Sequence, residues 1–444
     1  MKIDHLVHQF PPESEGGLES YVRDLVVAQR QAGSDVEVVS GSLAARPRFA
    51  LEASELEGVP VTRLHRADLY FDAWDKGAHP EIEAYLRDRW ARARPDLVHV
   101  HHWIRLTENI VAVARDLGLP VVVTLHDFAP SCPRAFRMYA ADETPCARTL
   151  GPENCVPCAH RWPWADDAEA AAAVTWFRRN SRAELLGADV LLCASHAVGD
   201  LVAAGLDLPR DRIEILPLGA RPRFSGVPAR SALSDELHLA YWGSVTERKG
   251  IPLLVRAFRR AVEETGAAAR LTIFGGVDRP ELEARILEDA REAPVRLAGR
   301  FEYEDLPAAG IDLAVFPSLC LETWGLVLDE AQELGVPAIV PDAGAMAERL
   351  GGGGATFTIQ NEDSLAAVLG RLLRDRSEVA RLTAAVPRPS GSFESHQAAL
   401  EAVYRRTVAG PRRPGTPEIE IDPRERAGRV FARAESMFRA LLGG

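Results

Sequence analysis

The sequence predicts an α/β protein of two doubly wound domains, each a parallel sheet with helices on both faces. Three observations predict this class. The 444 residues are too many for one ordinary hydrophobic core and suit two large domains. Short apolar runs alternate with amphipathic helical patterns, which is typical of strand–helix–strand units. One stretch rich in Pro, Gly and Ser, residues 220–236, interrupts the alternation and indicates a linker.

The first domain is expected to span residues 1–219. Its first helix is predicted at LESYVRDLVVAQRQAG, and its strands at IDHLVHQF, DVEVVSG, DLVHVHH, PVVVTLHD, ADVLLCAS and RIEILPLG. Polar residues at strand ends are favoured site positions in such sheets, so His126, at the end of PVVVTLHD, is a candidate. A hydrogen-bonded structural histidine is the alternative, which we prefer for His99, His101 and His102.

The second domain is expected to span residues 237–408. Its strands are predicted at LHLAYWGS, RLTIFGG, PVRLAGRF, IDLAVFPS and PAIVPD, with helical patterns between them. Two such domains joined by a linker predict a ligand cleft between them. Residues 409–444 are expected to form a tail with a last amphipathic helix, RERAGRVFARAESMFRALL.

Charge and composition narrow the functional classes. A formal net charge of −12 argues against a general nucleic-acid surface, which needs clustered Lys and Arg. The N-terminal MKIDHLVHQFPP lacks the apolar core of a signal peptide, and no stretch approaches the roughly 18 apolar residues of a membrane span. We therefore expect a soluble, cytoplasmic protein, and the richness in Ala, Arg and Gly is typical of a bacterial, high-GC genome. The basic stretch YLRDRWARARP allows peripheral contact with an anionic lipid surface, although a solvated helix face is the simpler interpretation.

The segment SLCLETWGLVLDEAQELGVP has an unusual pair of carboxylates. Glu322 lies just before a predicted helix, and Glu330 lies about 12 Å further along it. Between them the backbone N–H groups of Gly325, Leu326 and Val327 are suited to bind phosphate. Carboxylates accept hydrogen bonds from hydroxyls, so one ligand with phosphates between two hydroxylated ends, such as a nucleotide sugar, explains the pattern. A surface helix with solvated glutamates is the alternative.

Two loops add weaker signals. Lys249, in WGSVTERKG, follows a predicted strand and is placed to neutralise a diphosphate, although a solvated loop lysine is the simpler interpretation. The segment has no G-x-G-x-x-G, so it is not the dinucleotide fingerprint. Gly16 and Gly17, between the first strand and first helix, let backbone N–H groups face the cleft, and a plain turn is the alternative.

In combination these motifs resemble those of the retaining glycosyltransferases of family 4, which have the two-domain GT-B fold with two Rossmann-like domains. The resemblance covers residues 1 to about 408, with HQFPPESEGGLESYVRDL, LPLGA, GSVTERKG and PSLCLETWGLVLDEAQELGVPAIV in the family's order. It implies that Glu322 contacts the hydroxyls of the donor sugar and that Glu330 contacts the ribose of its nucleotide. Lys249 would counter the diphosphate charge, and His126 would lie near the anomeric carbon.

The resemblance also implies roles for two backbone segments. The Gly16–Gly17 loop would close over donor and acceptor, and the Arg300–Phe301 backbone would lie near the base. Family members commonly have Arg directly after the glycine that begins GSVTERKG, but this chain has Ser244. Either Arg248 supplies the missing charge or the diphosphate is held less tightly.

The implied activity is transfer of a hexosyl group from a nucleoside diphosphate sugar to an acceptor, with retained configuration and no catalytic metal. Polysaccharide, lipid-linked glycan and natural-product acceptors all remain open. An epimerase or a phosphorylase of similar architecture is one rival, and no motif for a pyridoxal-bearing lysine is visible. The rival from another class is a catalytically silent GT-B protein that uses its cysteine-rich insert as an interaction module.

This insert, residues 131–160, has the spacing C-x(13)-C-x(8)-C-x(2)-C, formed by Cys132, Cys146, Cys155 and Cys158. Four thiolates suit tetrahedral zinc, with an iron–sulfur cluster or free thiols as alternatives. A structural role is expected, because four protein ligands leave no open position for a substrate. Some bacterial members of the resembled family have a similar insert. Since it follows His126, the insert is expected to border the acceptor side of the cleft.

Overall fold

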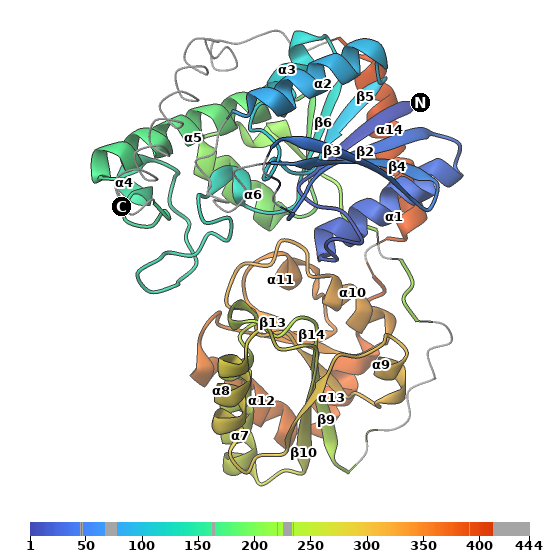
Figure 1. Ribbon diagram of the computed structural model, residues 1–444. Coiled ribbons are helices and arrows are strands. Elements are labelled where there is room, and N and C mark those ends of the chain that lie inside the picture. The colour runs from blue at the N-terminus through green and yellow to red at the C-terminus, as the bar shows by residue number, and fades with distance from the viewer. Residues whose placement is uncertain are drawn as a thin grey trace.

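The computed structural model describes residues 1–44, 46, 48–66, 78–161, 165–219, 221–224, 233, 235–389 and 391–411. Within these residues the chain forms two sheets flanked by helices, which lie one above the other in Figure 1. All strand pairs are parallel except one hairpin at an edge of the first sheet. The predicted class of two doubly wound α/β domains is therefore confirmed.

The first sheet is built from the N-terminal half of the chain. Its strands are β1 (Lys2–Val7), β2 (Asp35–Gly41), β3 (Ala50–Leu56), β4 (Val59–His65), β5 (Leu97–Val100), β6 (Val121–Leu125), β7 (Val190–Cys193) and β8 (Ile213–Ile215). Their order is β3-β4-β2-β1-β5-β6-β7-β8. The accompanying helices are α1 (Gly17–Gln31), α2 (Pro80–Arg92), α3 (Ile110–Asp116), α4 (Pro152–Cys155), α5 (Asp167–Gly187) and α6 (His196–Leu206). The central strands β5 and β6 are buried along their whole length, as expected where helices cover both faces of a sheet, and each is apolar except for one residue, His99 or Thr124.

The second sheet follows the linker. Its strands are β9 (Leu237–Trp242), β10 (Ala269–Phe274), β11 (Val295–Gly299), β12 (Leu313–Val315), β13 (Ala338–Pro341) and β14 (Gly354–Phe357), in the order β11-β10-β9-β12-β13-β14. Its helices are α7 (Ile251–Thr265), α8 (Pro280–Ala290), α9 (Asp305–Ala308), α10 (Leu326–Glu333), α11 (Ala345–Arg349), α12 (Glu362–Arg374) and α13 (Arg376–Ala384). One continuous apolar core joins this sheet to its helices.

The strand order reverses beside one central strand in each sheet. β1 lies between β2 and β5, and β9 lies between β10 and β12. Ligands of doubly wound sheets bind outside the carboxyl ends of the strands at such a point. The loops after β1, β5 and β6, and those after β9 and β12, are thus in position to hold a ligand.

The last described helix, α14 (Phe393–Ala409), departs from the sequence-based assignment of residues 237–408 to one domain. It packs on the first sheet with α1, as Figure 1 also shows, and Leu400, Val403 and Tyr404 are buried there. The helical period of this segment predicts one buried face but not which sheet buries it. Tertiary packing determines that the first sheet buries the apolar face of α14.

Two expectations fall largely outside the described residues. Most of the linker assigned to residues 220–236 is not described, nor is the predicted tail helix beyond residue 411. Among the helices that are described, none combines the length and the apolar character needed to cross a membrane.

Candidate active site

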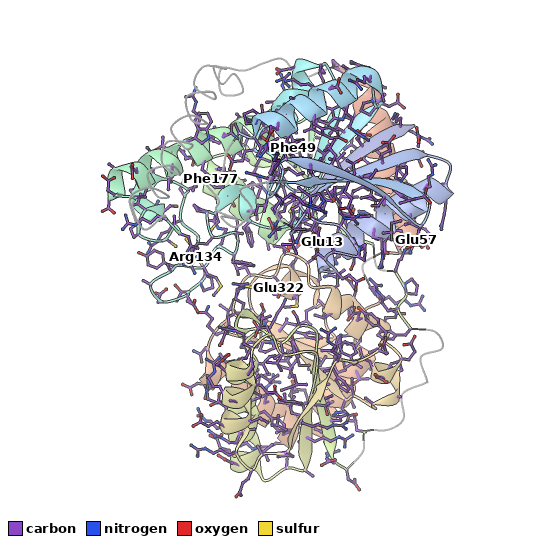
Figure 2. All side chains as sticks on the ribbon, in the orientation of Figure 1. Glu13, Phe49, Glu57, Arg134, Phe177 and Glu322 are labelled. Carbon is purple, nitrogen blue, oxygen red and sulfur yellow. The ribbon has the colours of Figure 1, made fainter. Side chains whose placement is uncertain are left out.

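A pocket of about 390 Å³ lies between the two sheets, at the carboxyl ends of their strands. That volume falls in the range of about 300–1,000 Å³ typical of ligand sites. Figure 2 shows Glu322 on the face of the second domain that meets the first. The expected site residues that line this pocket, here called the cleft, are Gly16, Gly17, His126, Ser244, Lys249, Phe301, Glu322, Gly325, Leu326, Val327 and Glu330.

Lys249 and Glu322 form an ion pair on the wall of the cleft, with 2.7 Å between Nζ and Oε1. Lys249 ends a short 3-10 helix that follows β9, and Glu322 lies between β12 and α10. Since β9 and β12 are neighbours in the sheet, their loops meet. Burial opposes the charge on Lys249, but the Glu322 carboxylate outweighs burial and raises the pKa of Lys249. The lysine is therefore a fixed positive charge in the cleft.

The N-terminus of α10 opens into the same cleft. Gly325 is its N-cap residue with a φ of 79°, and Leu326 and Val327 follow it along the wall. A Cβ on Gly325 would lie 2.6 Å from Cγ of Met346, so glycine is required both by conformation and by space. Unpaired N–H groups and the helix dipole favour an anion at this end.

Glu330 lies on α10 within the cleft wall and is almost completely buried. Trp242, the last residue of β9, donates a hydrogen bond from Nε1 to Glu330 Oε2 at 2.7 Å. Burial raises the pKa of Glu330 to about 7, although the bonds from Trp242 and Tyr303 favour the carboxylate. A ligand that donates hydrogen bonds to Glu330 would thus shift its ionisation near neutral pH.

The opposite wall comes from the first domain. Gly16 is the N-cap residue of α1, and Gly17 begins the helix. A Cβ on Gly17 would lie 3.6 Å from Cδ1 of Leu326, so the starts of α1 and α10 face each other across the cleft. Two helix N-termini aimed at one space reinforce its preference for an anion.

His126 directly follows β6 and is half-buried in the cleft wall. Its Nε2 lies 3.0 Å from Nδ1 of His101, and its ring lies beside that of Tyr21. Burial lowers the pKa of His126 to about 3. At neutral pH this imidazole is uncharged and has one donor and one acceptor nitrogen.

Two expected site residues lie elsewhere. The guanidinium of Arg248 is 3.9 Å from the ring centroid of Phe136 in the cysteine-rich insert, and Arg248 does not line the described cleft. Arg300 is exposed and is also absent from this lining, whereas its neighbour Phe301 is present. Ser244 lines the cleft and accepts a hydrogen bond from the Tyr241 hydroxyl at its carbonyl, at 2.7 Å. Arg248 thus contacts the insert rather than replacing the missing arginine.

Several residues that line the cleft were not predicted from the sequence. Tyr21, Tyr241, Trp242 and Trp324 are aromatic residues close to strand ends or helix starts, and that placement was the available signal. Arg223 also lines the cleft, and it comes from the linker, where no periodicity marked it. The backbone N–H of Arg223 donates a hydrogen bond to the carboxylate of Glu333 in α10.

The four insert cysteines gather in one region without forming a closed ligand set. Burial, and to a smaller degree the other three cysteines, raise the pKa of Cys155 to about 11. Tetrahedral zinc would hold its sulfur atoms about 3.8 Å apart. In the described chain no three of these sulfur atoms lie within 4.8 Å of one another, and only His5, His99 and His101 form such a group. Zinc in the insert therefore stays a prediction.

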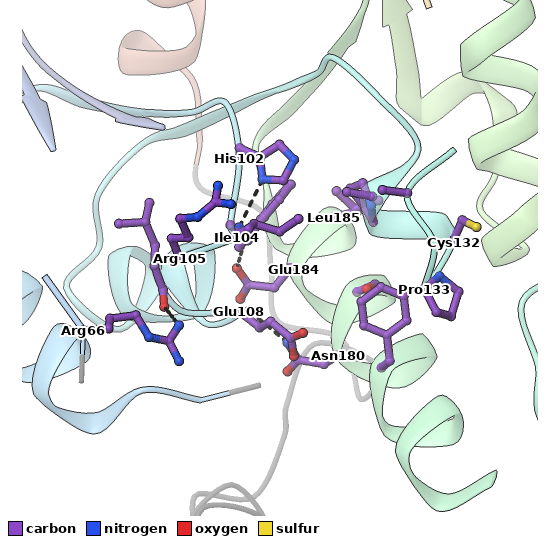
Figure 3. A pocket seen from close by; sticks show the side chains of 17 residues that line it. Arg66, His102, Ile104, Arg105, Glu108, Cys132, Pro133, Asn180, Glu184 and Leu185 are labelled. Atoms are coloured by element: carbon purple, nitrogen blue, oxygen red, sulfur yellow. Dashed lines mark hydrogen bonds between the residues drawn. The ribbon is translucent and has the colours of Figure 1, made fainter. Parts of the chain in front are cut away.

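A second pocket, of about 80 Å³, lies beside the cleft within the first domain (Figure 3). Its walls are the loop after β5, the start of the insert and α5, and they are mostly apolar. His102 in this wall lies 3.1 Å from Asp127 Oδ2, the residue next to His126. Burial opposes the charge on Asp127, but His102 outweighs burial and lowers the pKa of Asp127 to about 2. The His102–Asp127 pair thus connects the wall of this pocket to His126 in the cleft wall.

Comparison with known proteins now gives the family. Residues 15–224 match the sequence model of Glycosyltransferase Family 4, and residues 236–375 match that of Glycosyl transferases group 1. The N-terminal half thus matches glycosyltransferase family 4, and the chain is a glycosyltransferase. The D-inositol 3-phosphate glycosyltransferase of Rhodococcus erythropolis is 26% identical over 93% of this chain and 91% of its own length. The glycogen synthase of Mycobacterium tuberculosis is 26% identical over 93% of this glycosyltransferase and 97% of its own length.

Solved structures share the fold. HepE of Anabaena in complex with UDP has a TM-score of 0.61 at 16% identity, covering 91% of this glycosyltransferase and 100% of HepE. Sucrose-phosphate synthase of Thermosynechococcus elongatus has a TM-score of 0.60 at 19% identity, covering 92% of this glycosyltransferase and 100% of the synthase. A trehalose-6-phosphate synthase was solved to study glycosyl transfer with retention. It has a TM-score of 0.61 at 13% identity, covering 91% of this glycosyltransferase and 99% of the synthase.

Proposed function

We propose that this glycosyltransferase moves a hexosyl group from a nucleoside diphosphate sugar to a hydroxyl acceptor, with retained anomeric configuration. One observation carries the proposal: Lys249 and the N-termini of α1 and α10 converge on a cleft that two carboxylates also line. Positive charge between two hydroxyl-binding carboxylates matches a diphosphate between a sugar and a ribose. HepE was solved with UDP in a related fold, which supports this donor class.

Glu322 and Glu330 are assigned to opposite ends of the donor. Glu322, paired with Lys249, would accept hydrogen bonds from the transferred sugar, and Glu330 would accept them from the ribose. The diphosphate would lie over the N–H groups of Gly325, Leu326 and Val327. Because the leaving diphosphate gains charge as the glycosidic bond breaks, these groups and Lys249 would stabilise the transition state more than the ground state.

Retention is proposed from the family and from the trehalose-6-phosphate synthase that shares the fold. The acceptor hydroxyl would attack from the face that the diphosphate leaves, and its proton would pass to a departing phosphate oxygen. The chain would supply orientation and charge, with His126 beside the reacting carbon.

For the acceptor, the small pocket of Figure 3 favours a molecule with an apolar group near its reactive hydroxyl. Ile104, Pro133, Phe177 and Leu185 contribute to its apolar wall. About 80 Å³ suits a short hydrocarbon group, since an engineered cavity of about 150 Å³, almost twice this volume, binds one benzene ring. Of the acceptors left open by the sequence, natural products and lipid-linked glycans fit this wall better than a plain polysaccharide.

Nucleotide release from a panel of nucleoside diphosphate sugars tests the proposal. We expect release with at least one donor, and a fall of about 100-fold in Glu322→Gln. Glu283→Gln, an exposed carboxylate on α8, is the matched control and should behave as wild type. NMR of the product anomeric proton decides retention, and an inverted product would contradict it. Absence of release with every donor and candidate acceptor would favour the catalytically silent alternative.

A further inference from the structure

A chain of hydrogen-bonded side chains runs through the first domain and ends at His126 in the cleft. All six of its links are between 2.7 and 3.4 Å long. They connect strands β1, β5 and β6 with helices α1 and α14. In order, the members are Thr124, His99, Tyr404, Gln29, His5, His101 and His126.

The three histidines at the cleft end of this chain, His5, His101 and His126, are uncharged at neutral pH. Burial lowers the pKa of His5 to about 4 and that of His126 to about 3, and it lowers the pKa of His101 well below its usual value. A neutral imidazole has one N–H donor and one acceptor nitrogen. In a row of such rings, the direction of one hydrogen bond, from donor to acceptor, therefore determines the direction of the next. We call this direction the polarity of the row.

Gln29 sets the direction of this row. Its Nε2 donates to the Tyr404 hydroxyl, and its Oε1 lies 2.8 Å from His5 Nε2. Oε1 is an acceptor, so His5 is protonated at Nε2 and accepts at Nδ1 from His101 Nε2–H. His101 then accepts at Nδ1 from His126 Nε2–H, which leaves His126 Nδ1 without a proton. Rotation of the Gln29 amide by a half-turn would reverse every one of these links.

The same histidines contain the one group of metal-like spacing among the described residues, His5, His99 and His101. Their six ring nitrogens already have partners, because His99 binds Tyr404 and Thr124 while the other two belong to the row. A metal ion would have to displace these bonds. Structural evidence thus favours a hydrogen-bond network over a metal centre.

We propose that Gln29, His5 and His101 are positioning residues that hold His126 in one tautomer, with Nδ1 turned to the cleft as a hydrogen-bond acceptor. This inference rests on the proposed function for its ligand: a hydroxyl of the donor sugar or of the acceptor. The acceptor nitrogen orients that hydroxyl beside the reacting carbon. Because neither Gln29 nor His5 lines the described cleft, they act only through the row.

¹⁵N-histidine NMR of the whole chain tests the tautomer without any substrate. Two-bond ¹H–¹⁵N correlations, assigned to His126 by comparison with His126→Asn, should show a protonated Nε2 and an unprotonated Nδ1. In Gln29→Met the acceptor for His5 is lost, and the His126 signals should move toward a mixture of tautomers. A protonated Nδ1 in wild type, or no change in Gln29→Met, would overturn the proposal.

Kinetics add a second measurement, with His101→Gln and His101→Leu as a pair. Glutamine can donate to His5 and accept from His126, so it preserves the polarity, whereas leucine cannot. We expect kcat to fall about 3- to 10-fold in His101→Leu, as for one lost hydrogen bond, and to recover in His101→Gln. Equal losses in both variants, with unchanged thermal unfolding, would contradict the role of polarity. If wild type releases no nucleotide at all, the proposed function fails, while the NMR result still decides the tautomer.

Discussion

Trp242 Nε1 donates a hydrogen bond to Glu330 Oε2 at 2.7 Å, and this bond ties the end of β9 to α10. It fixes one oxygen of a carboxylate that burial would otherwise leave protonated. The indole thereby holds Glu330 in the cleft wall at the position where we place the ribose. Ionisation of Glu330 and donor binding should accordingly be coupled.

Nucleotide affinity should depend on pH through Glu330. The pKa of this group is raised to about 7 in the free protein, and ribose hydroxyls bind its carboxylate form. The affinity for the donor nucleotide should therefore fall below pH 7, approaching tenfold per pH unit for one coupled proton. Isothermal titration between pH 5.5 and 8.5 measures this, and Glu330→Gln should flatten the dependence. A pH-independent affinity in wild type would contradict the coupling.

Loss of the Lys249 charge should slow the chemical step. Lys249→Met removes the cation proposed to stabilise the leaving diphosphate, so kcat/KM should fall about 10- to 150-fold, corresponding to about 1.5–3 kcal/mol. Steady-state kinetics with the best donor measures the kcat/KM of Lys249→Met and of wild type. Arg296→Met, which removes an exposed cation on β11, is the control. Equal rates in the two variants would exclude the assigned role.

Gly325 should tolerate no side chain. In Gly325→Ala the new Cβ would meet Met346 at 2.6 Å, whereas in Gly266→Ala, with a similar φ of 63°, it would meet nothing within 4 Å. The control Gly266→Ala should lose only about 1 kcal/mol of its free energy of unfolding, because alanine is disfavoured in the left-handed backbone conformation. Gly325→Ala should lose more stability and also its nucleotide-induced shift in Tm. Differential scanning fluorimetry with and without nucleotide measures both. A normal nucleotide shift in Gly325→Ala would contradict the proposed phosphate position.

Filling the pocket of Figure 3 should change the acceptor preference and leave the donor preference intact. Ser181 of α5 lines it, so Ser181→Leu should raise KM for acceptors with an apolar group, while Ser181→Ala serves as the size-matched control. Acceptor competition assays would show the difference. If Ser181→Leu treats apolar and polar acceptors alike, the pocket is not part of the acceptor site.

The insert cysteines should bind one zinc ion per chain if the spacing prediction is right. Binding would draw the four sulfur atoms together, since no three of them lie within 4.8 Å of one another in the described structure. Elemental analysis of purified protein should find zinc, and Cys158→Ser should lose it while Cys193→Ser, on β7, retains it. Iron in place of zinc would support the cluster alternative. Metal-free protein of normal stability would exclude both.

Local pattern was enough to predict the sheets, the cleft and the carboxylate pair. Apolar runs predicted the buried strands, and the spacing of Glu322 and Glu330 around a helix start predicted two groups that the fold places in one pocket. Strand ends must meet at one edge of a parallel sheet, so placement of His126 also followed from the pattern.

Contacts that depend on tertiary packing could not be predicted from the local sequence. An exposed arginine can turn either way, and Arg248 turns to Phe136 because that ring offers a cation–π contact. Trp242 had no sequence signal as the partner of Glu330, since the two are 88 residues apart. The hydrogen-bonded chain that ends at His126 depends on side chains from three strands and two helices, which only the folded protein brings together.

The position of α14 has a consequence for biosynthesis. Tyr404 and the rest of this helix close the first sheet, yet the ribosome makes them after the whole second sheet. The N-terminal half therefore cannot reach its final packing while the chain is still short, although domains usually mature in the order of translation. The N-terminal half is complete only when α14 has been made. A premature stop after α13 would therefore shorten the C-terminal half and also leave the first sheet without the helix that covers it.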